Sequence, residues 1–134
     1  MKLLLDTHIL IWALNDDPRL PKKARELLLK PENSIYYSVV SIWEVAIKHA
    51  IHPENVTFTG RELAQFCNDA GFLPLNMQEK HVFSLETIER ENDAPPHNDP
   101  FDRILIAQAK TEKMRFLTHD ALLPYYKEPC ILPV

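Results

Sequence analysis

Short apolar segments alternate with helix-like segments along the chain, and this alternation constrains the fold more than any other feature. The apolar, β-branched and aromatic runs predict strands at residues 2–5, 35–38, 72–75, 116–118 and 131–132. Helices are expected between them, at residues 7–14, 21–30, 41–52, 60–70, 78–89 and 100–113. Such alternation favours a parallel sheet covered by helices on both faces. We therefore expect an α/β protein, a three-layer α/β/α sandwich with a mostly parallel central sheet.

The 134 residues fit a single domain, residues 1–134, that is large enough to bury a core without staples. No apolar run approaches the roughly 18–20 residues of a membrane span, so no membrane association is expected. The only cysteines are Cys67 and Cys130, which show no paired spacing. A reduced, cytoplasmic location is therefore the expectation.

Four acidic residues stand where predicted strands end or predicted helices begin. Asp6 and Asp120 follow strands, whereas Glu44 and Asp102 fall in the first turn of apolar-rich helices. The carboxyl ends of parallel strands meet in one crevice, where α/β folds bind ligands. Carboxylates without interleaved Lys or Arg repel one another, so such a cluster needs a hard divalent cation. The pattern therefore predicts a metal site suited to phosphodiester chemistry.

The excess of acidic over basic residues in the chain equals the number of acids at this predicted site. The chain has 15 basic and 19 acidic residues, a charge of −4, and without the four acids the count is balanced at 15 against 15. A nucleic-acid-binding protein usually carries a basic excess, so tight sequence-independent binding is not indicated. Metal ions that bridge to phosphate would offset part of this objection.

Each acid also has a purely structural interpretation. Asp6 and Asp120 can act as helix N-caps, in which the carboxylate accepts a backbone N–H. Glu44 completes a capping box with Ser41 and stands four residues before Lys48, a favourable spacing for an ion pair. The Glu44 helix is apolar nearly all round, so we expect it to be buried, with these polar residues as a narrow stripe. From the residues alone, cap and ligand both remain open.

In the third acidic segment the two carboxylates are expected to have different roles. Asp99-Pro100 is a strong helix-start signature, with Asp as the N-cap and Pro as the first helical residue. Asp102 follows one turn later and is freer to point into a crevice, so we favour Asp102 as the ligand. The histidines form no pair at ligand spacing on one helix face, and a zinc hydrolase is therefore not indicated.

Four segments resemble the acidic motifs of PIN domains and together cover essentially the whole chain in order. They are Met1-Lys2-Leu3-Leu4-Leu5-Asp6-Thr7-His8, Ser41-Ile42-Trp43-Glu44-Val45-Ala46-Ile47-Lys48, the segment from His97 to Ala109, and Phe116-Leu117-Thr118-His119-Asp120. The resemblance extends to the VapC-like group of single-domain bacterial and archaeal PIN proteins. It implies a PIN-like fold and an endoribonuclease that uses Mg²⁺ or Mn²⁺, with one or two ions per site.

The resemblance also implies roles for residues and partners. It makes Asp6, Glu44, Asp102 and Asp120 the catalytic and metal-binding acids, and leaves a contribution from Asp99 open. Thr7, Lys48 and Arg103 are candidate substrate contacts, although Lys48 and Arg103 equally suit charge pairing with nearby acids. The partners implied are RNA, a small VapB-like antitoxin and a second copy of the chain, as in the toxin of a type II toxin–antitoxin system. The alternative is a catalytically silent PIN module that binds RNA or protein.

Overall fold

A computed structural model describes all of residues 1–134 and contains five strands, six α-helices and one short 3₁₀ helix. The strands are β1 (Lys2–Leu5), β2 (Ser34–Ser38), β3 (Leu73–Leu75), β4 (Arg115–Thr118) and β5 (Ile131–Pro133). The helices are α1 (Thr7–Leu14), α2 (Lys22–Leu29), α3 (Val39–Ile51), α4 (Gly60–Asp69), α5 (Glu79–Leu85) and α6 (Pro100–Glu112), with the 3₁₀ helix η1 at Leu123–Tyr125. Every predicted strand and helix is present, within a few residues of its expected bounds.

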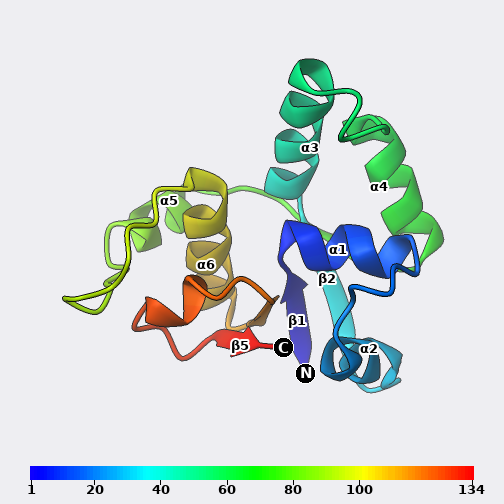
Figure 1. Cartoon of the computed structure of the whole chain (residues 1–134). Coiled ribbons are helices and arrows are strands. Elements are labelled where there is room, and N and C mark those ends of the chain that lie inside the picture. The colour runs from blue at the N-terminus through cyan, green and yellow to red at the C-terminus, as the bar shows by residue number, and fades with distance from the viewer.

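The strands form one sheet in the order β3-β2-β1-β4-β5, and all four neighbouring pairs are parallel. Strand β1 is therefore central, flanked by β2 and β4. Because the strands are parallel, their carboxyl ends lie along one edge of the sheet, as Figure 1 shows for β1 and β2. The predicted parallel sheet is confirmed, and Asp6 follows directly after its central strand.

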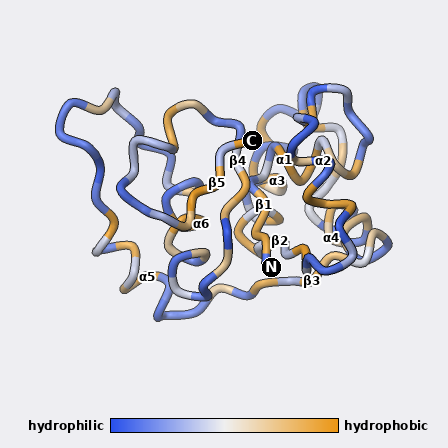
Figure 2. Tube along the Cα trace, turned by 90° about the horizontal axis from the view of Figure 1, so that it is seen from below, coloured by the Kyte–Doolittle hydropathy of each residue, from blue (hydrophilic) through white to orange (hydrophobic).

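Successive leucines of β1 face opposite sides of the sheet, and this alternation creates the two cores of the sandwich. Leu4 packs in a cluster with residues of α6, whereas Leu3 and Leu5 pack in a second cluster with residues of α1, α2 and α4. Helices therefore cover both faces, as the sequence predicted. The outer loops are mostly hydrophilic, and the central strands are hydrophobic (Figure 2).

Helix α3 begins earlier than expected, and this corrects the predicted capping box. The N-cap is Ser38, whose hydroxyl accepts the Val40 N–H at 3.0 Å, so β2 runs into α3 without a loop. Ser41 is therefore not a cap, and Glu44 lies beyond the first turn of the helix. Glu44 and Asp102 were both predicted to lie in the first turn of a helix. The prediction is confirmed for Asp102 and wrong for Glu44.

The expectation that α3 is buried on all sides is also wrong. Trp43 is 58% exposed, and its ring meets Phe101 edge-on with 5.1 Å between the ring centroids. With Val39 and Met77 it lines an apolar depression of about 300 Å³ between α3 and α6. This side of α3 therefore leaves Val39, Trp43 and Met77 each at least 40% exposed.

Helix α5 ends at Leu85 rather than near residue 89. Thr87 closes the helix because both its backbone N–H and its hydroxyl donate to the Ser84 carbonyl, at 3.0 Å and 2.7 Å. None of the helices combines the length and the apolar character that crossing a membrane requires.

Candidate metal site at the carboxyl edge of the sheet

A small cavity of about 80 Å³ opens at the carboxyl edge of the sheet, and no hydrophobic residue lines it. Its walls come from the β1–α1 junction, α3, the start of α6 and the segment after β4. The lining residues are Asp6, Thr7, His8, Glu44, Lys48, Asp99, Asp102 and Asp120. A larger, mostly apolar depression of about 410 Å³ lies elsewhere, beside Ala13 and Phe66, and contains none of the four acids.

Asp6 occupies the N-cap position of α1, but its carboxylate makes no capping hydrogen bond. Instead it accepts the Thr118 hydroxyl at 2.7 Å, across the ends of the neighbouring strands β1 and β4. The residue is only 6% exposed, and burial raises the pKa of the Asp6 carboxyl to about 6, with the negative charge of Glu44 adding to the rise. The side-chain N-cap interpretation of Asp6 is therefore wrong.

Glu44 reaches the cavity from α3 and is held by two neighbours. The Thr7 hydroxyl donates to Oε1 at 2.8 Å, and Lys48 Nζ contacts Oε2 at 2.5 Å. The predicted pairing with Lys48 is thus confirmed. Ser41, which the sequence suggested as the cap, lies 2.8 Å from the Thr7 hydroxyl and contributes to the same buried network. Glu44 itself is 4% exposed.

Asp99 and Asp102 have the different local positions that the sequence predicted. The Asp99 carboxylate caps α6, accepting the N–H groups of Phe101 at 2.9 Å and Asp102 at 3.4 Å. The Asp102 carboxylate points into the cavity and is 13% exposed. Burial raises the pKa of Asp102 to about 8, and the negative charges of Asp6, Asp99, Glu44 and Asp120 add to the shift. Asp99 also lines the cavity, so its cap role leaves a contribution to the site open.

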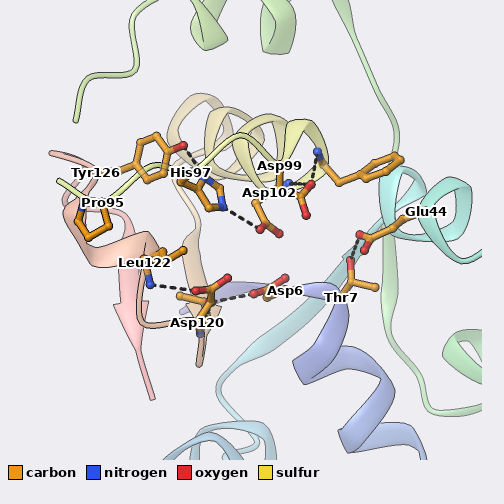
Figure 3. Close-up of polar contacts among 12 residues, drawn as sticks. Asp6, Thr7, Glu44, Pro95, His97, Asp99, Asp102, Asp120, Leu122 and Tyr126 are labelled. Atoms are coloured by element: carbon orange, nitrogen blue, oxygen red, sulfur yellow. Dashed lines mark hydrogen bonds and ion pairs between the residues drawn. The ribbon is translucent and has the colours of Figure 1, made fainter. Parts of the chain in front are cut away.

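Asp120 combines a structural role with a position in the cavity. One oxygen of its carboxylate accepts the Leu122 N–H at 2.9 Å, in the manner of a helix N-cap. Its own backbone N–H donates to Thr118, the residue that also holds Asp6. The carboxylates of Asp6, Asp102 and Asp120 point toward one another in Figure 3, with Glu44 on the other side of Asp102.

Two residues that hold these acids, Thr118 and His97, are not among the predicted site residues. Thr118 ends β4 and donates to Asp6. His97 comes from the loop before α6 and contacts the Asp102 carboxylate through Nε2, at 3.1 Å. Burial lowers the pKa of His97, which favours the neutral imidazole. A search for histidines on one helix face cannot find His97, because it lies in a loop; its place five residues before Asp102 was the only signal.

The two candidate basic contacts have different positions. Lys48 lines the cavity and is paired with Glu44. Arg103 is not among the lining residues, and its buried Nε has no hydrogen-bond partner. Its positive charge still acts on His97, which contacts Asp102, and the role of Arg103 as a substrate contact stays a prediction.

The donor set of the cavity fits a hard divalent cation. Five carboxylates line it against one lysine, and two of them have a raised pKa because they are buried close to other negative charges. Oxygen ligands of this kind suit Mg²⁺, Ca²⁺ and Mn²⁺. A bound cation would remove the repulsion that the carboxylates experience when they are all ionised.

Comparisons with known proteins show the fold and the family of the chain. No curated protein matches the chain. One chain of the crystal structure of VapBC2 from Rickettsia felis, bound to a DNA fragment from the promoter, aligns with a TM-score of 0.65 at 13% identity, over 100% of this chain and 98% of that one. A chain of a toxin–antitoxin complex from Klebsiella pneumoniae aligns with a TM-score of 0.54 at 17% identity, over 97% and 95%. At these identities the likeness shows the fold alone. The family model of the PIN domain matches residues 3–128, and the chain belongs to the PIN domain family.

Proposed function

We propose that this protein is a divalent-cation-dependent endoribonuclease, the VapC-like toxin of a type II toxin–antitoxin system. One observation carries the proposal: four separate chain segments bring Asp6, Glu44, Asp102 and Asp120 to one hydrophilic cavity at the carboxyl edge of the sheet. Four converging carboxylates are costly to a fold unless they bind something positive. The membership of the PIN family and the toxin–antitoxin complexes among the structural neighbours support the same proposal.

The four acids are the residues that we assign to one or two Mg²⁺ or Mn²⁺ ions. Bound by these residues, a divalent ion would supply an activated water as the nucleophile and would offset negative charge on the phosphate and the leaving oxygen. Neighbouring side chains of the protein orient two of these acids. Thr118 orients Asp6, whereas Thr7 and Lys48 orient Glu44.

The protonation of Asp102 links cation binding to pH. With a pKa of about 8, this carboxyl holds a proton near neutral pH when no cation is present. Cation binding at Asp102 then requires release of that proton, because the ionised carboxylate is the ligand. We expect the apparent cation affinity to increase as the pH is raised from 6 to 8.

We further propose a small VapB-like antitoxin and a second copy of the chain as partners. The two structural neighbours come from complexes described as VapBC2 and as toxin–antitoxin. The uncovered apolar depression beside Trp43 supports an interface with a second copy, because exposed apolar patches mark interaction sites. Both cysteines are free, which supports a reduced cytoplasmic setting.

The test is RNA cleavage by the purified protein with Mg²⁺, with Mn²⁺ and with EDTA. We expect cleavage only with a cation, and loss of cleavage in Asp6→Asn and Asp102→Asn. Asp93→Asn, at an exposed loop acid, is the matched control and should cleave like the wild type. RNA binding without cleavage under every cation condition would favour the silent PIN module, and full activity of Asp6→Asn would refute the assignment of that residue.

A further inference from the structure

His97 lies on the side of Asp102 that faces away from Glu44 (Figure 3). Its Nε2 is 3.1 Å from Asp102 Oδ2. One ligand atom from each of His97, Asp102 and Asp120 lies within 4.8 Å of the others. His97 is not one of the residues that line the cavity, but its Nε2 adds a nitrogen donor beside the carboxylates of Asp102 and Asp120. The side near Glu44 offers oxygens and the amine of Lys48.

The imidazole of His97 is fixed in its orientation. Its Nδ1 is 2.7 Å from the Tyr126 hydroxyl, and the two rings meet edge-on with centroids 5.4 Å apart. The Arg90 guanidinium covers the Tyr126 ring at 5.2 Å, and Arg90 also contacts the Pro95 carbonyl of the same loop. With its side chain only 5% exposed, His97 has Nε2 held toward the carboxylates.

This arrangement has the two parts of a histidine metal ligand. Metal-binding histidines use one ring nitrogen as the ligand and engage the other in a hydrogen bond that fixes the ring, as Tyr126 does here. Two neighbouring ligands that are each about 2.1 Å from an ion are about 3.0 Å apart when they subtend a right angle. The separation of 3.1 Å between Nε2 and the Asp102 oxygen is close to this spacing.

We propose that His97 Nε2, together with the carboxylates of Asp102 and Asp120, forms a mixed nitrogen–oxygen cation position that prefers Mn²⁺ or Co²⁺ to Mg²⁺. Imidazole is a better ligand for transition metals than for Mg²⁺, which takes oxygen ligands almost exclusively. The inference deepens the proposed function, since it concerns the cations of the same crevice. It makes a claim about binding alone, so it is testable without RNA.

The direct test is pulsed electron paramagnetic resonance on the metal-free protein loaded with one equivalent of Mn²⁺. We expect modulation from a coordinated histidine nitrogen in the wild type, and its replacement by the ¹⁵N pattern when the histidines are ¹⁵N-labelled. The labelling arm needs no substitution, so it stays valid even where a variant fails to fold. Absence of any nitrogen modulation would overturn the proposal.

Variants then assign the nitrogen to one residue. His97→Ala should abolish the modulation, whereas His119→Ala and His8→Ala should retain it. These controls test the other histidines near the acids: His8 lines both the metal cavity and a neighbouring one, and His119 lines the neighbouring cavity beside Asp6 and Asp120, where its Nδ1 contacts the Val134 carbonyl. Loss of the modulation in either control, with retention in His97→Ala, would overturn the assignment.

Calorimetric titrations with Co²⁺ and with Mg²⁺ test the preference. In His97→Ala, Co²⁺ affinity should fall by about 10-fold or more, and Tyr126→Phe should lose about 10-fold by removing the hydroxyl that holds the ring. Mg²⁺ affinity should change much less in both variants. Equal losses for both cations would mean that His97 only supports the Asp102 carboxylate, and would refute the preference. A protein that cleaves no RNA but shows the nitrogen signal would reject the proposed function and keep this inference.

Discussion

Replacing Asp102 by Asn should make the metal-free protein more stable than the wild type, by a margin that grows with pH. Burial and four neighbouring acids raise the pKa of Asp102 to about 8, so between pH 5 and 7 the folded protein keeps a proton that the unfolded chain releases. A group whose folded pKa is raised favours the folded state most at low pH, and this contribution is lost as the pH rises toward that pKa. Asn cannot ionise, so Asp102→Asn does not lose stability in this way as the pH rises.

The expected size follows from the proton balance. One proton held only by the folded state changes stability by about 1.4 kcal/mol for each pH unit. Over the two units from pH 5 to 7, the advantage of Asp102→Asn over the wild type should therefore increase by about 2–3 kcal/mol. Asp6, whose pKa is raised to about 6, titrates in both proteins and largely cancels in the comparison.

Urea unfolding followed by circular dichroism at pH 5 and pH 7, with EDTA present, measures this difference. Asp93→Asn is the control because this residue is exposed in the loop before α6, and its stability difference from the wild type should not vary with pH. A pH-independent difference between the wild type and Asp102→Asn would refute the reasoning, as would an advantage that shrinks on raising the pH.

Cation binding should itself stabilise the fold: at Mg²⁺ or Mn²⁺ concentrations 100 times the dissociation constant, stability should rise by about 2.7 kcal/mol. Thermal denaturation should show this as a higher Tm, and Asp6→Asn should cancel most of the rise. Thr7→Val leaves the buried Glu44 carboxylate without its hydroxyl donor, so urea unfolding should report a loss of about 1–3 kcal/mol; an unchanged midpoint would contradict this contact. Asp99→Ala should cost about 1 kcal/mol by removing the α6 cap, but should keep the cation-induced rise in Tm. Disappearance of that rise would instead make Asp99 a ligand.

The sheet and the convergence of the acids depend on local sequence. The run Leu3-Leu4-Leu5 is apolar at every position, as expected for a strand buried on both faces, and parallel pairing brings the carboxyl ends of the strands to one edge. The division between Asp99 and Asp102 was predictable for the same reason, because Asp-Pro is a strong local signal for the start of a helix.

Contacts between distant segments decided the points that local sequence left open. Ser38 and Ser41 are both able to cap α3, and Ser38 does so while its hydroxyl also donates to Gln108, 70 residues away. The contact between His97 and Tyr126 joins two loops 29 residues apart, and no periodic pattern links them. Local sequence preferences do not predict such pairs, because each pair depends on how the whole sheet assembles.

The hydrogen bond from Thr118 to Asp6 joins residues that are 112 positions apart. Because synthesis runs from the N-terminus, a ribosome makes Asp6 and Glu44 before Asp102 and Asp120. The crevice is therefore incomplete until Asp120, which follows β4, has been made. For an enzyme proposed to cut RNA, this order of synthesis would protect its own messenger and the ribosome that is reading it until Asp120 has been added.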